Sequence, residues 1–271
     1  METVILRDAI DALSAVIFAA PCRVCQEPLV KLSRIPICEK CLASIRVIEG
    51  PVCEACGRPS APGLKAGGGE TAGAEPAAGR LCRVCRGDFF SFRRARSYAE
   101  YADVAVSAIQ LLKYEEVTRL GEFFGAKLAE VALREKEAFA ADVVVPVPLH
   151  ADRRRERGYN QAELIARPVA RRLGVGLGSY LLVRKLPRPA QLLLTRAERW
   201  KSVRGAYATR EGIRVDKLRV LLVDDVMTTG ATLEACARAL KNAGAAEVVA
   251  LTVARVVPRW RQPEPPEGGG L

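Results

Sequence analysis

The sequence predicts an α/β fold, a mostly parallel sheet with helices on both faces, preceded by a small cysteine-rich module. Apolar runs at 142–149, 219–224 and 247–257 alternate with helical patterns. Strands that alternate with helices form parallel sheets whose two faces are both covered. Upstream, eight of the nine cysteines fall into four C-x-x-C pairs. The length of 271 residues favours two domains.

The composition is that of a globular protein with anionic partners. Hydrophobic residues make up 49% and charged residues 27% of the chain, which excludes wholesale disorder. The net charge of +11 favours phosphorylated small molecules, nucleic acid or a membrane surface as partners. No apolar run reaches the roughly 18 residues of a membrane span. Residues 1–20 lack the cationic start and clean apolar run of a secretory signal, so we expect a cytoplasmic protein.

The first element, residues 1–20, is predicted to be an amphipathic helix that docks on the rest of the chain. Its apolar residues recur at three- and four-residue spacing, as Leu6, Ile10, Leu13 and Ile17.

The cysteine pairs come next and predict two structural zinc ions. They are Cys22 and Cys25, Cys38 and Cys41, Cys53 and Cys56, and Cys82 and Cys85. Two such pairs present four thiolates to one Zn²⁺ and leave no open position for a substrate. Sequential pairing needs no crossing connection and is preferred to an interleaved arrangement. Disulfides are the other alternative, disfavoured without an export signal.

Residues 57–81, between the last two cysteine pairs, are almost all Gly, Ala, Pro and a few charges, and predict a mobile loop. Short strands or a hairpin are expected at 89–101, helices at 104–114 and 118–139, a strand at 142–149 and a helix at 160–173. A glycine turn at 174–178 follows. The remaining elements are a strand at 219–224, a helix at 231–243, a strand at 247–257 and a disordered tail at 258–271.

The strongest chemical signal lies at the end of the strand at 219–224. This strand delivers Asp224 and Asp225, and a helix then opens with Thr228, Thr229, Gly230, Ala231 and Thr232. Backbone N–H groups at a helix start bind phosphate, and Gly230 lets the backbone approach closely. The two carboxylates suit the vicinal hydroxyls of a ribose. A generic strand-turn-helix is the alternative.

The sequence offers few residues for other kinds of catalytic chemistry. His150 is the only histidine, so a serine or cysteine nucleophile with an imidazole base is not expected. The ninth cysteine, Cys236, sits in a helical pattern and is expected to be a small buried side chain.

The strand-end motif is similar to the phosphoribosyl pyrophosphate motif of type I phosphoribosyltransferases. With the cysteine pairs, VPVPLH at 145–150 and RGYNQ at 157–161, the chain resembles the ComF family of competence proteins. The resemblance covers nearly the whole chain, excepting the Gly/Ala-rich loop and the tail. It implies a double zinc ribbon at 21–88 and a type I phosphoribosyltransferase-like domain at 89–257.

The resemblance also implies a pyrophosphate loop after Pro148, where four arginines stand in five consecutive positions. Guanidinium groups bind phosphate in bidentate fashion and suit a diphosphate with its Mg²⁺. The residues expected to serve there are Arg153, Arg157, Tyr159 and Asn160. A solvated basic loop or a nucleic-acid patch is the alternative. Either Val145–Pro146 or Val147–Pro148 is a candidate for a cis bond.

A mobile hood is implied between 184 and 207, marked by Arg184, Gln191, Arg199 and the sequence Gly205-Ala206-Tyr207. Ser202 stands where relatives often carry asparagine. A lid of this kind excludes water from the reaction.

The motifs and the family resemblance predict two functions. The first is an enzyme that binds phosphoribosyl pyrophosphate with Mg²⁺ and transfers the phosphoribosyl group to a nitrogen acceptor that no residue identifies. The second, which the resemblance also implies, is a DNA uptake factor whose zinc ribbons and basic surface bind single-stranded DNA or a helicase partner. The aromatic content of 6% offers few stacking platforms for the second. The two functions are compatible.

Overall fold

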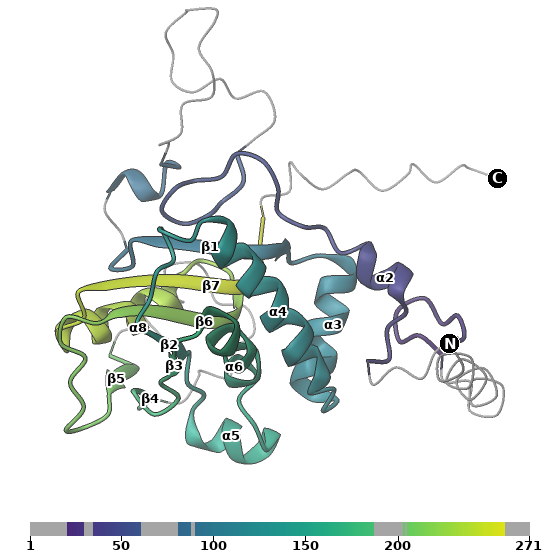
Figure 1. Cartoon of the computed structure of the whole chain (residues 1–271). Helices are drawn as coiled ribbons and strands as arrows, with labels where there is room; N and C mark the ends of the chain where they lie inside the picture. Colours follow the sequence, from purple (N-terminus) through teal and green to yellow (C-terminus); the bar gives the residue numbers. More distant parts are fainter. Residues whose placement is uncertain are drawn as a thin grey trace, which may run out of the picture.

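The computed structural model describes residues 21–29, 35–60, 81–87, 90–186, 203 and 205–257. Its centre is a five-stranded sheet in the order β1-β7-β6-β2-β3, with every pair parallel (Figure 1). The strands are β1 (Arg94–Glu100), β2 (Val143–Pro146), β3 (Gly176–Leu177), β6 (Arg219–Met227) and β7 (Glu247–Arg255). The predicted α/β fold with a parallel sheet is confirmed.

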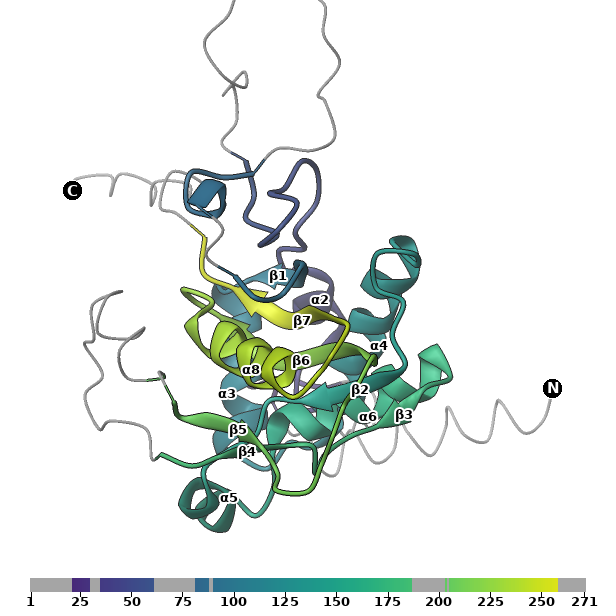
Figure 2. The same cartoon turned by 90° about the vertical axis from the view of Figure 1, so that its left-hand side faces the viewer.

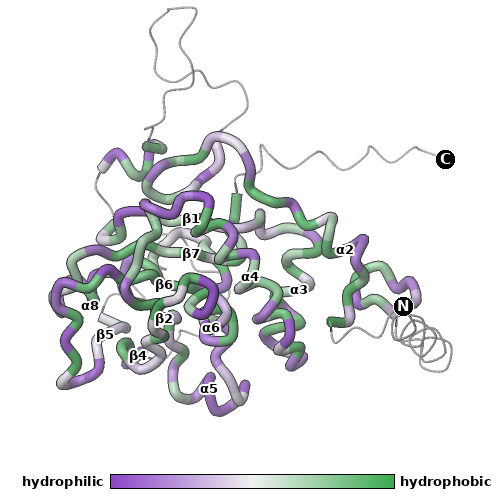
Figure 3. Tube along the Cα trace, viewed as in Figure 1, coloured by the Kyte–Doolittle hydropathy of each residue, from purple (hydrophilic) through white to green (hydrophobic). Residues whose placement is uncertain are grey.

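Helices cover both faces of this sheet, as Figures 1 and 2 show. One face carries α3 (Asp103–Tyr114), α4 (Arg119–Arg134) and α6 (Gln161–Leu173), and the other carries α8 (Ala231–Asn242). Successive strand residues point to opposite faces. Leu221 and Val223 of β6 therefore pack with α3, α4 and α6, whereas Val220 and Leu222 pack with α8. Figure 3 shows hydrophobic residues along the central strands and hydrophilic residues in α5.

Several element bounds differ from the prediction. The region 89–101 gives one strand, β1, instead of a hairpin. The strand at 219–224 continues to Met227, because β7 pairs with it as far as Arg255, so both aspartates lie within β6. The arginine segment forms a short helix, α5 (Ala151–Arg157), that ends at Gly158 with φ +76°.

Three short strands were not predicted as such. Part of the expected glycine turn is the edge strand β3, and β4 (Leu182–Arg184) pairs with β5 (Tyr207–Thr209) in a separate antiparallel sheet. No peptide bond is cis in the described part of the chain, so neither candidate proline bond is cis.

The second cysteine-rich segment lies along β1, an edge strand of the sheet, whereas the first lies beyond the end of β1, beside α3 (Figure 1). The N–H of Ile48 donates to the carbonyl of Tyr98 at 2.9 Å, and that of Ala95 donates to Ala55 at 2.7 Å. The chain between the two segments thereby covers an edge that would otherwise present unpaired backbone groups.

The cysteine segments share buried clusters with the sheet. Cys22 and Cys41, the latter within α2 (Glu39–Ala43), join the cluster on the α3 face. Cys53, Cys56 and Cys85, the last of which begins the short helix η1 (Cys85–Gly87), join the cluster on the α8 face. The domain boundary expected near residue 88 stays a prediction.

Some predicted features lie outside the described residues. These are the helix at 1–20, most of the loop at 57–81, Gln191, Arg199, Ser202 and the tail at 258–271. Among the helices that the structure describes, none has the length and apolar character needed to cross a bilayer.

Candidate functional site

Eight cysteines form two clusters of four. Four sulfurs lie within 4.8 Å of one another in each cluster, which comprise Cys22, Cys25, Cys38 and Cys41, and Cys53, Cys56, Cys82 and Cys85. The Cys22–Cys41 and Cys56–Cys82 sulfur separations are 3.9 and 3.8 Å. A tetrahedral Zn²⁺ with Zn–S bonds of about 2.3 Å holds its sulfurs about 3.8 Å apart. The donor set therefore fits zinc, and the sequential pairing is confirmed.

Both clusters begin with the same backbone turn. The N–H groups of Cys22 and Cys53 each donate at 2.8 Å to the carbonyl five residues ahead. The residue after the second cysteine is left-handed in both, with φ +64° at Gln26 and +65° at Gly57. A Cβ on Gly57 would lie 2.6 Å from the carbonyl oxygen of Ala95. Glycine is required in the second turn because that turn rests directly on β1.

Arg255, the last residue of β7, lies beside the second cluster. It is 1% exposed and donates to the carbonyl of Cys56, while its Nε has no partner among the described residues. Burial lowers its pKa, and the neighbouring Cys56 sulfur opposes this effect. Four thiolates and one Zn²⁺ together carry two negative charges, so the buried guanidinium offsets part of the charge of a zinc-loaded cluster.

The two predicted aspartates lie at the carboxyl end of β6. Asp224 is 8% and Asp225 5% exposed. Strand alternation places Asp225 on the α3 and α6 face and Asp224 on the α8 face, where its charge acts on Cys236. The N–H of Asp225 donates to the Asp224 carboxylate at 2.9 Å. The carboxylates therefore flank the strand end on two sides instead of forming one patch.

Asp225 has a partner on each carboxylate oxygen. Its Oδ1 lies 2.9 Å from Nζ of Lys113, near the end of α3. Its Oδ2 accepts a hydrogen bond from Nε2 of Gln161, the first residue of α6, at 2.6 Å. Burial lowers the pKa of Lys113, but Asp225 outweighs this effect and raises the pKa above its usual value. The pair is therefore a partly buried ion pair.

The loop at 228–230 joins β6 to α8. Gly230 is the N-cap of α8 with φ +84°, and a Cβ there would lie 2.8 Å from the Phe90 ring and 2.9 Å from the Met227 methyl group. Conformation and space both require glycine. Gly230 provides no side-chain cap for α8, and the N–H of Ala231 donates to Oγ1 of Thr229 at 3.4 Å, so the loop itself partly satisfies the helix start, which is where a phosphate would bind. The loop and first-turn threonines are half-buried and comprise Thr228, Thr229 and Thr232.

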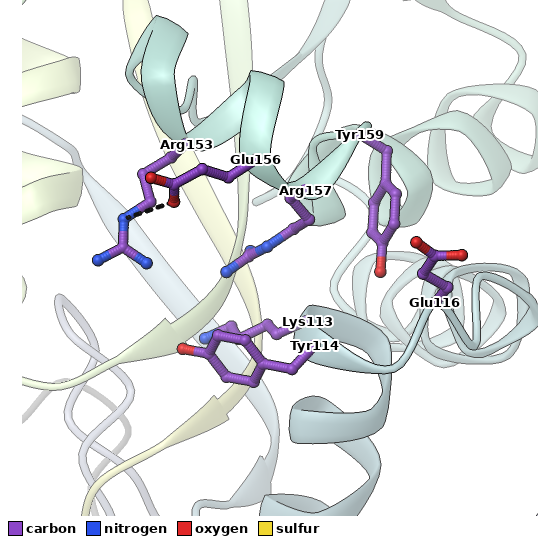
Figure 4. Close-up of a pocket in the computed structure, with 7 residues that line it drawn as sticks. All are labelled: Lys113, Tyr114, Glu116, Arg153, Glu156, Arg157 and Tyr159. Atoms are coloured by element: carbon purple, nitrogen blue, oxygen red, sulfur yellow. Dashed lines mark ion pairs between the residues drawn. The ribbon is translucent and has the colours of Figure 1, made fainter.

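An open pocket lies between α5 and the end of α3 (Figure 4). It is lined by Lys113, Tyr114, Glu116, Arg153, Glu156, Arg157 and Tyr159. Arg153 and Arg157 are four residues apart in α5 and so share one face of the helix. Arg154 is directed elsewhere and pairs with Glu163 of α6 at 3.5 Å.

Arg157 connects this pocket to the strand end. Its guanidinium carbon lies 5.1 Å from the ring centroid of Tyr114. Its Nη1 donates at 2.5 Å to Oε1 of Gln161, whose amide nitrogen donates to Asp225. A continuous set of contacts therefore runs from Arg157, one of the two predicted diphosphate arginines, to Asp225, a predicted ribose carboxylate.

Two other predicted ligand residues make structural contacts. The Tyr159 hydroxyl donates to the carbonyl of Leu112 at 2.5 Å. Asn160 is the N-cap of α6, where its Oδ1 accepts an N–H at 3.1 Å and its Nδ2 donates to the carbonyl of Val147 at 3.0 Å. The first contact holds the chain between α5 and α6 against α3, and the second holds the start of α6 next to the end of β2. The ligand roles of both residues stay predictions.

Of the hood residues, Arg184 and the sequence Gly205-Ala206-Tyr207 lie in the described part of the chain. Arg184 lies in β4, with its guanidinium carbon 5.3 Å from the ring centroid of Tyr207 in β5. Cys236 is fully buried, as expected, and burial raises the pKa of its thiol well above the usual value.

Sequence reasoning missed Lys113, Tyr114, Phe90 and Arg255. Lys113 left a signal, because Ala105, Ile109 and Lys113 recur every four residues and the first two are fully buried. A lysine in register with an apolar helix face requires a buried partner. Arg255 follows an apolar strand in the same way, whereas nothing in the sequence indicates that Phe90 reaches Gly230.

Comparison with known proteins gives similarity along most of the chain. Residues 160–266 match the family described as "Phosphoribosyl transferase domain". The DNA utilization protein YhgH of Salmonella typhimurium is 28% identical over 231 residues, 84% of this chain and 93% of that protein. The competence protein ComFC of Bacillus subtilis is 29% identical over 227 residues, 81% of this chain and 84% of that protein. Competence protein F of Haemophilus influenzae is 31% identical over 129 residues, 46% of this chain and 55% of that protein.

Proposed function

Because the chain belongs to the ComF family, we propose that it binds phosphoribosyl pyrophosphate with Mg²⁺ at the carboxyl ends of β2 and β6. Residues 228–232 would hold the 5-phosphate, Asp224 and Asp225 the ribose hydroxyls, and Arg153 and Arg157 the diphosphate. The observation that supports this most is the unbroken contact from Arg157 through Gln161 to Asp225. It joins the two ends of the proposed ligand site, which are more than 60 positions apart in the sequence.

The proposed reaction is transfer of the phosphoribosyl group to a nitrogen nucleophile. The bond between C1 of the ribose and the pyrophosphate oxygen breaks, and its electron pair leaves with pyrophosphate. The nitrogen lone pair forms the new bond to C1, and the nitrogen loses its proton to solvent. The arginines would stabilise the charge that develops on pyrophosphate, and the loop and carboxylates would hold the sugar in position.

The donor set also suits Mg²⁺. This ion binds through one or two carboxylates together with substrate phosphates and retained waters. Asp224 offers such a carboxylate at the strand end, and the diphosphate would supply the other oxygens. When bound, the ion neutralises charge on the diphosphate.

The decisive experiment is a thermal-shift titration with phosphoribosyl pyrophosphate and Mg²⁺. A ligand at about 100 times its Kd stabilises the folded state by about 2.7 kcal/mol, which raises the Tm of a chain of this size by about 5–10 °C. The Asp224→Asn/Asp225→Asn variant should lose this shift. Asp142→Asn is the matched control, because Asp142 is an exposed carboxylate that pairs with Arg219 at 2.7 Å at the other end of β6. No shift in the wild type, or an equal shift in the double variant, contradicts the proposal.

A role in DNA uptake or utilization is the second part of the proposal. The names of the relatives refer to competence and DNA utilization, and the net charge of +11 suits a phosphate backbone. Binding to single-stranded DNA should be measurable at low salt and should weaken as salt rises. Affinity that is absent or independent of salt would remove direct DNA binding from the proposal. A helicase partner stays a prediction.

A further inference from the structure

Lys113 belongs to two parts of the proposed site at once. Its Nζ lies 2.9 Å from Oδ1 of Asp225, at the end of the strand that would hold the ribose. It also lines the cationic pocket beside Arg153 and Arg157 (Figure 4). One ammonium group therefore stands between the diol carboxylate and the place proposed for the diphosphate.

Both carboxylate oxygens of Asp225 are engaged by protein groups, and the side chain is 8% exposed. A ribose hydroxyl that approaches Asp225 must therefore share or replace one of these partners. Gln161 is 6% exposed and is held from its other end by Arg157. Lys113 has a longer stem with freely rotating donors and a side chain that is 19% exposed. Lys113 is thus the partner that can move.

The neighbouring arginine does not have this freedom. Arg157 lies against the Tyr114 ring and donates to Gln161, so its guanidinium is already fixed at the pocket wall. A diphosphate that enters the pocket would meet the fixed Arg157, Arg153, which pairs with Glu156 at 3.7 Å, and one ammonium able to exchange its carboxylate for a phosphate oxygen. A buried carboxylate that loses its cation then requires hydrogen-bond donors, and a ribose diol supplies two.

Building on the proposed function, we propose that Lys113 is an exchangeable counter-ion that couples the two halves of the ligand. The diphosphate attracts the Lys113 ammonium away from Asp225. The released Oδ1 of Asp225 then accepts a hydrogen bond from a ribose hydroxyl. The site would then select molecules that carry a diphosphate and a sugar diol together, because each half prepares the site for the other. Lys113 acts here as a positioning residue.

Calorimetry on the full chain tests this coupling with two separate probes, magnesium pyrophosphate and ribose 5-phosphate. In the wild type, saturating pyrophosphate should tighten ribose 5-phosphate binding by about 5-fold to 100-fold, the usual range for linked sites. In Lys113→Met, pyrophosphate affinity should fall at least about 10-fold and the coupling ratio should approach 1. Lys127→Met is the control, because Lys127 pairs with Glu130 on α4 and should leave the coupling at the wild-type value.

A second variant guards against misfolding of the first. In Asp225→Asn the ammonium is no longer held, so pyrophosphate should bind at least as tightly as in the wild type, while ribose 5-phosphate binds more weakly and the coupling disappears. Loss of a residue that only stabilises the fold would not weaken the binding of ribose 5-phosphate while leaving the affinity for pyrophosphate at or above the wild-type value.

The outcomes separate the two proposals. If the wild type binds both probes but shows no coupling, or if Lys113→Met keeps the full coupling, the role of Lys113 is refuted and the binding site stands. If the wild type binds neither probe, the proposed function fails and the role of Lys113 fails with it.

Discussion

Replacing Arg255 with methionine tests whether the second cysteine cluster and the sheet form one electrostatic unit. Arg255 is 1% exposed and contacts the Cys56 carbonyl and, at 3.7 Å, the sulfur of Met227. Methionine keeps most of the buried volume and removes the charge. With zinc bound, the variant leaves two negative charges without their buried counter-ion. Without zinc, it removes a cation that is poorly partnered. Metal affinity should therefore fall, while the stability of the metal-free protein should not.

The size of the effect follows from the position of Arg255 next to the cysteine ligands, where it donates to the carbonyl of Cys56. Outer-shell groups change metal affinity by about 10-fold to 100-fold, which corresponds to about 1.4–2.8 kcal/mol. We therefore expect Arg255→Met to weaken zinc binding at the second cluster by that factor.

Competition with a chelating dye provides the assay, and the first cluster is an internal reference. Wild-type protein should release two zinc ions per chain, and Arg255→Met should release one of them at a 10-fold to 100-fold lower chelator concentration. Arg94→Met is the control variant, because Arg94 pairs with Glu135 at 2.7 Å and its removal should leave both release steps unchanged. Release curves that coincide for Arg255→Met and wild type, or an equal shift of both steps, would refute the reasoning.

Three further predictions concern single side chains. Gly230→Ala should abolish the thermal shift with phosphoribosyl pyrophosphate. Gly212→Ala is the control and should keep the shift, because Gly212 has φ +75° but nothing lies within 4 Å of the added Cβ. Equal thermal shifts in the two variants would show that crowding at Gly230 is unimportant. Glu135→Gln should lower the free energy of unfolding by about 1–3 kcal/mol at pH 7. Burial raises the pKa of Glu135, but two arginines of β1 outweigh burial and lower this pKa below the usual 4.5. The stability difference between wild type and Glu135→Gln should therefore shrink as the pH falls through the lowered pKa. A stability difference that persists in acid denaturation curves would contradict this prediction. Asn160→Ala should cost about 1–2 kcal/mol in urea unfolding through loss of the α6 cap, and Asn160→Asp should restore only part of it, because a carboxylate can cap α6 but cannot donate to the carbonyl of Val147.

The sheet was predictable because its strands are buried on both faces. Such strands appear as uninterrupted apolar runs, and the runs at 142–149 and 247–257 became β2 and β7. The strands of two or three residues, β3, β4 and β5, leave no periodicity to detect. Their positions depend on neighbours that are distant in the sequence.

Two local predictions failed for identifiable reasons. Aspartate is depleted in strands, so the pattern ended β6 at Asp224, but pairing with β7 extends the strand to Met227. The arginine segment has no apolar stripe and was expected to be a loop. It is a helix that His150 caps at its start and Gly158 ends, with an ion pair between Asp152 and Arg155 across one turn.

The cysteine clusters and the phosphate loop were predicted because each is a local motif with fixed spacing. The contacts that join them were not. Arg255 follows the apolar run of β7, and Lys113 lies in register with the apolar face of α3. Each breaks the rule that charged residues avoid the interior, and each has its counter-charge near the carboxyl end of the sheet. A charged residue within an apolar pattern therefore indicates, from the sequence alone, a residue near the carboxyl end of the sheet. The oppositely charged partner of that residue becomes known only in the structure, where the sheet brings α3, β6 and β7 together.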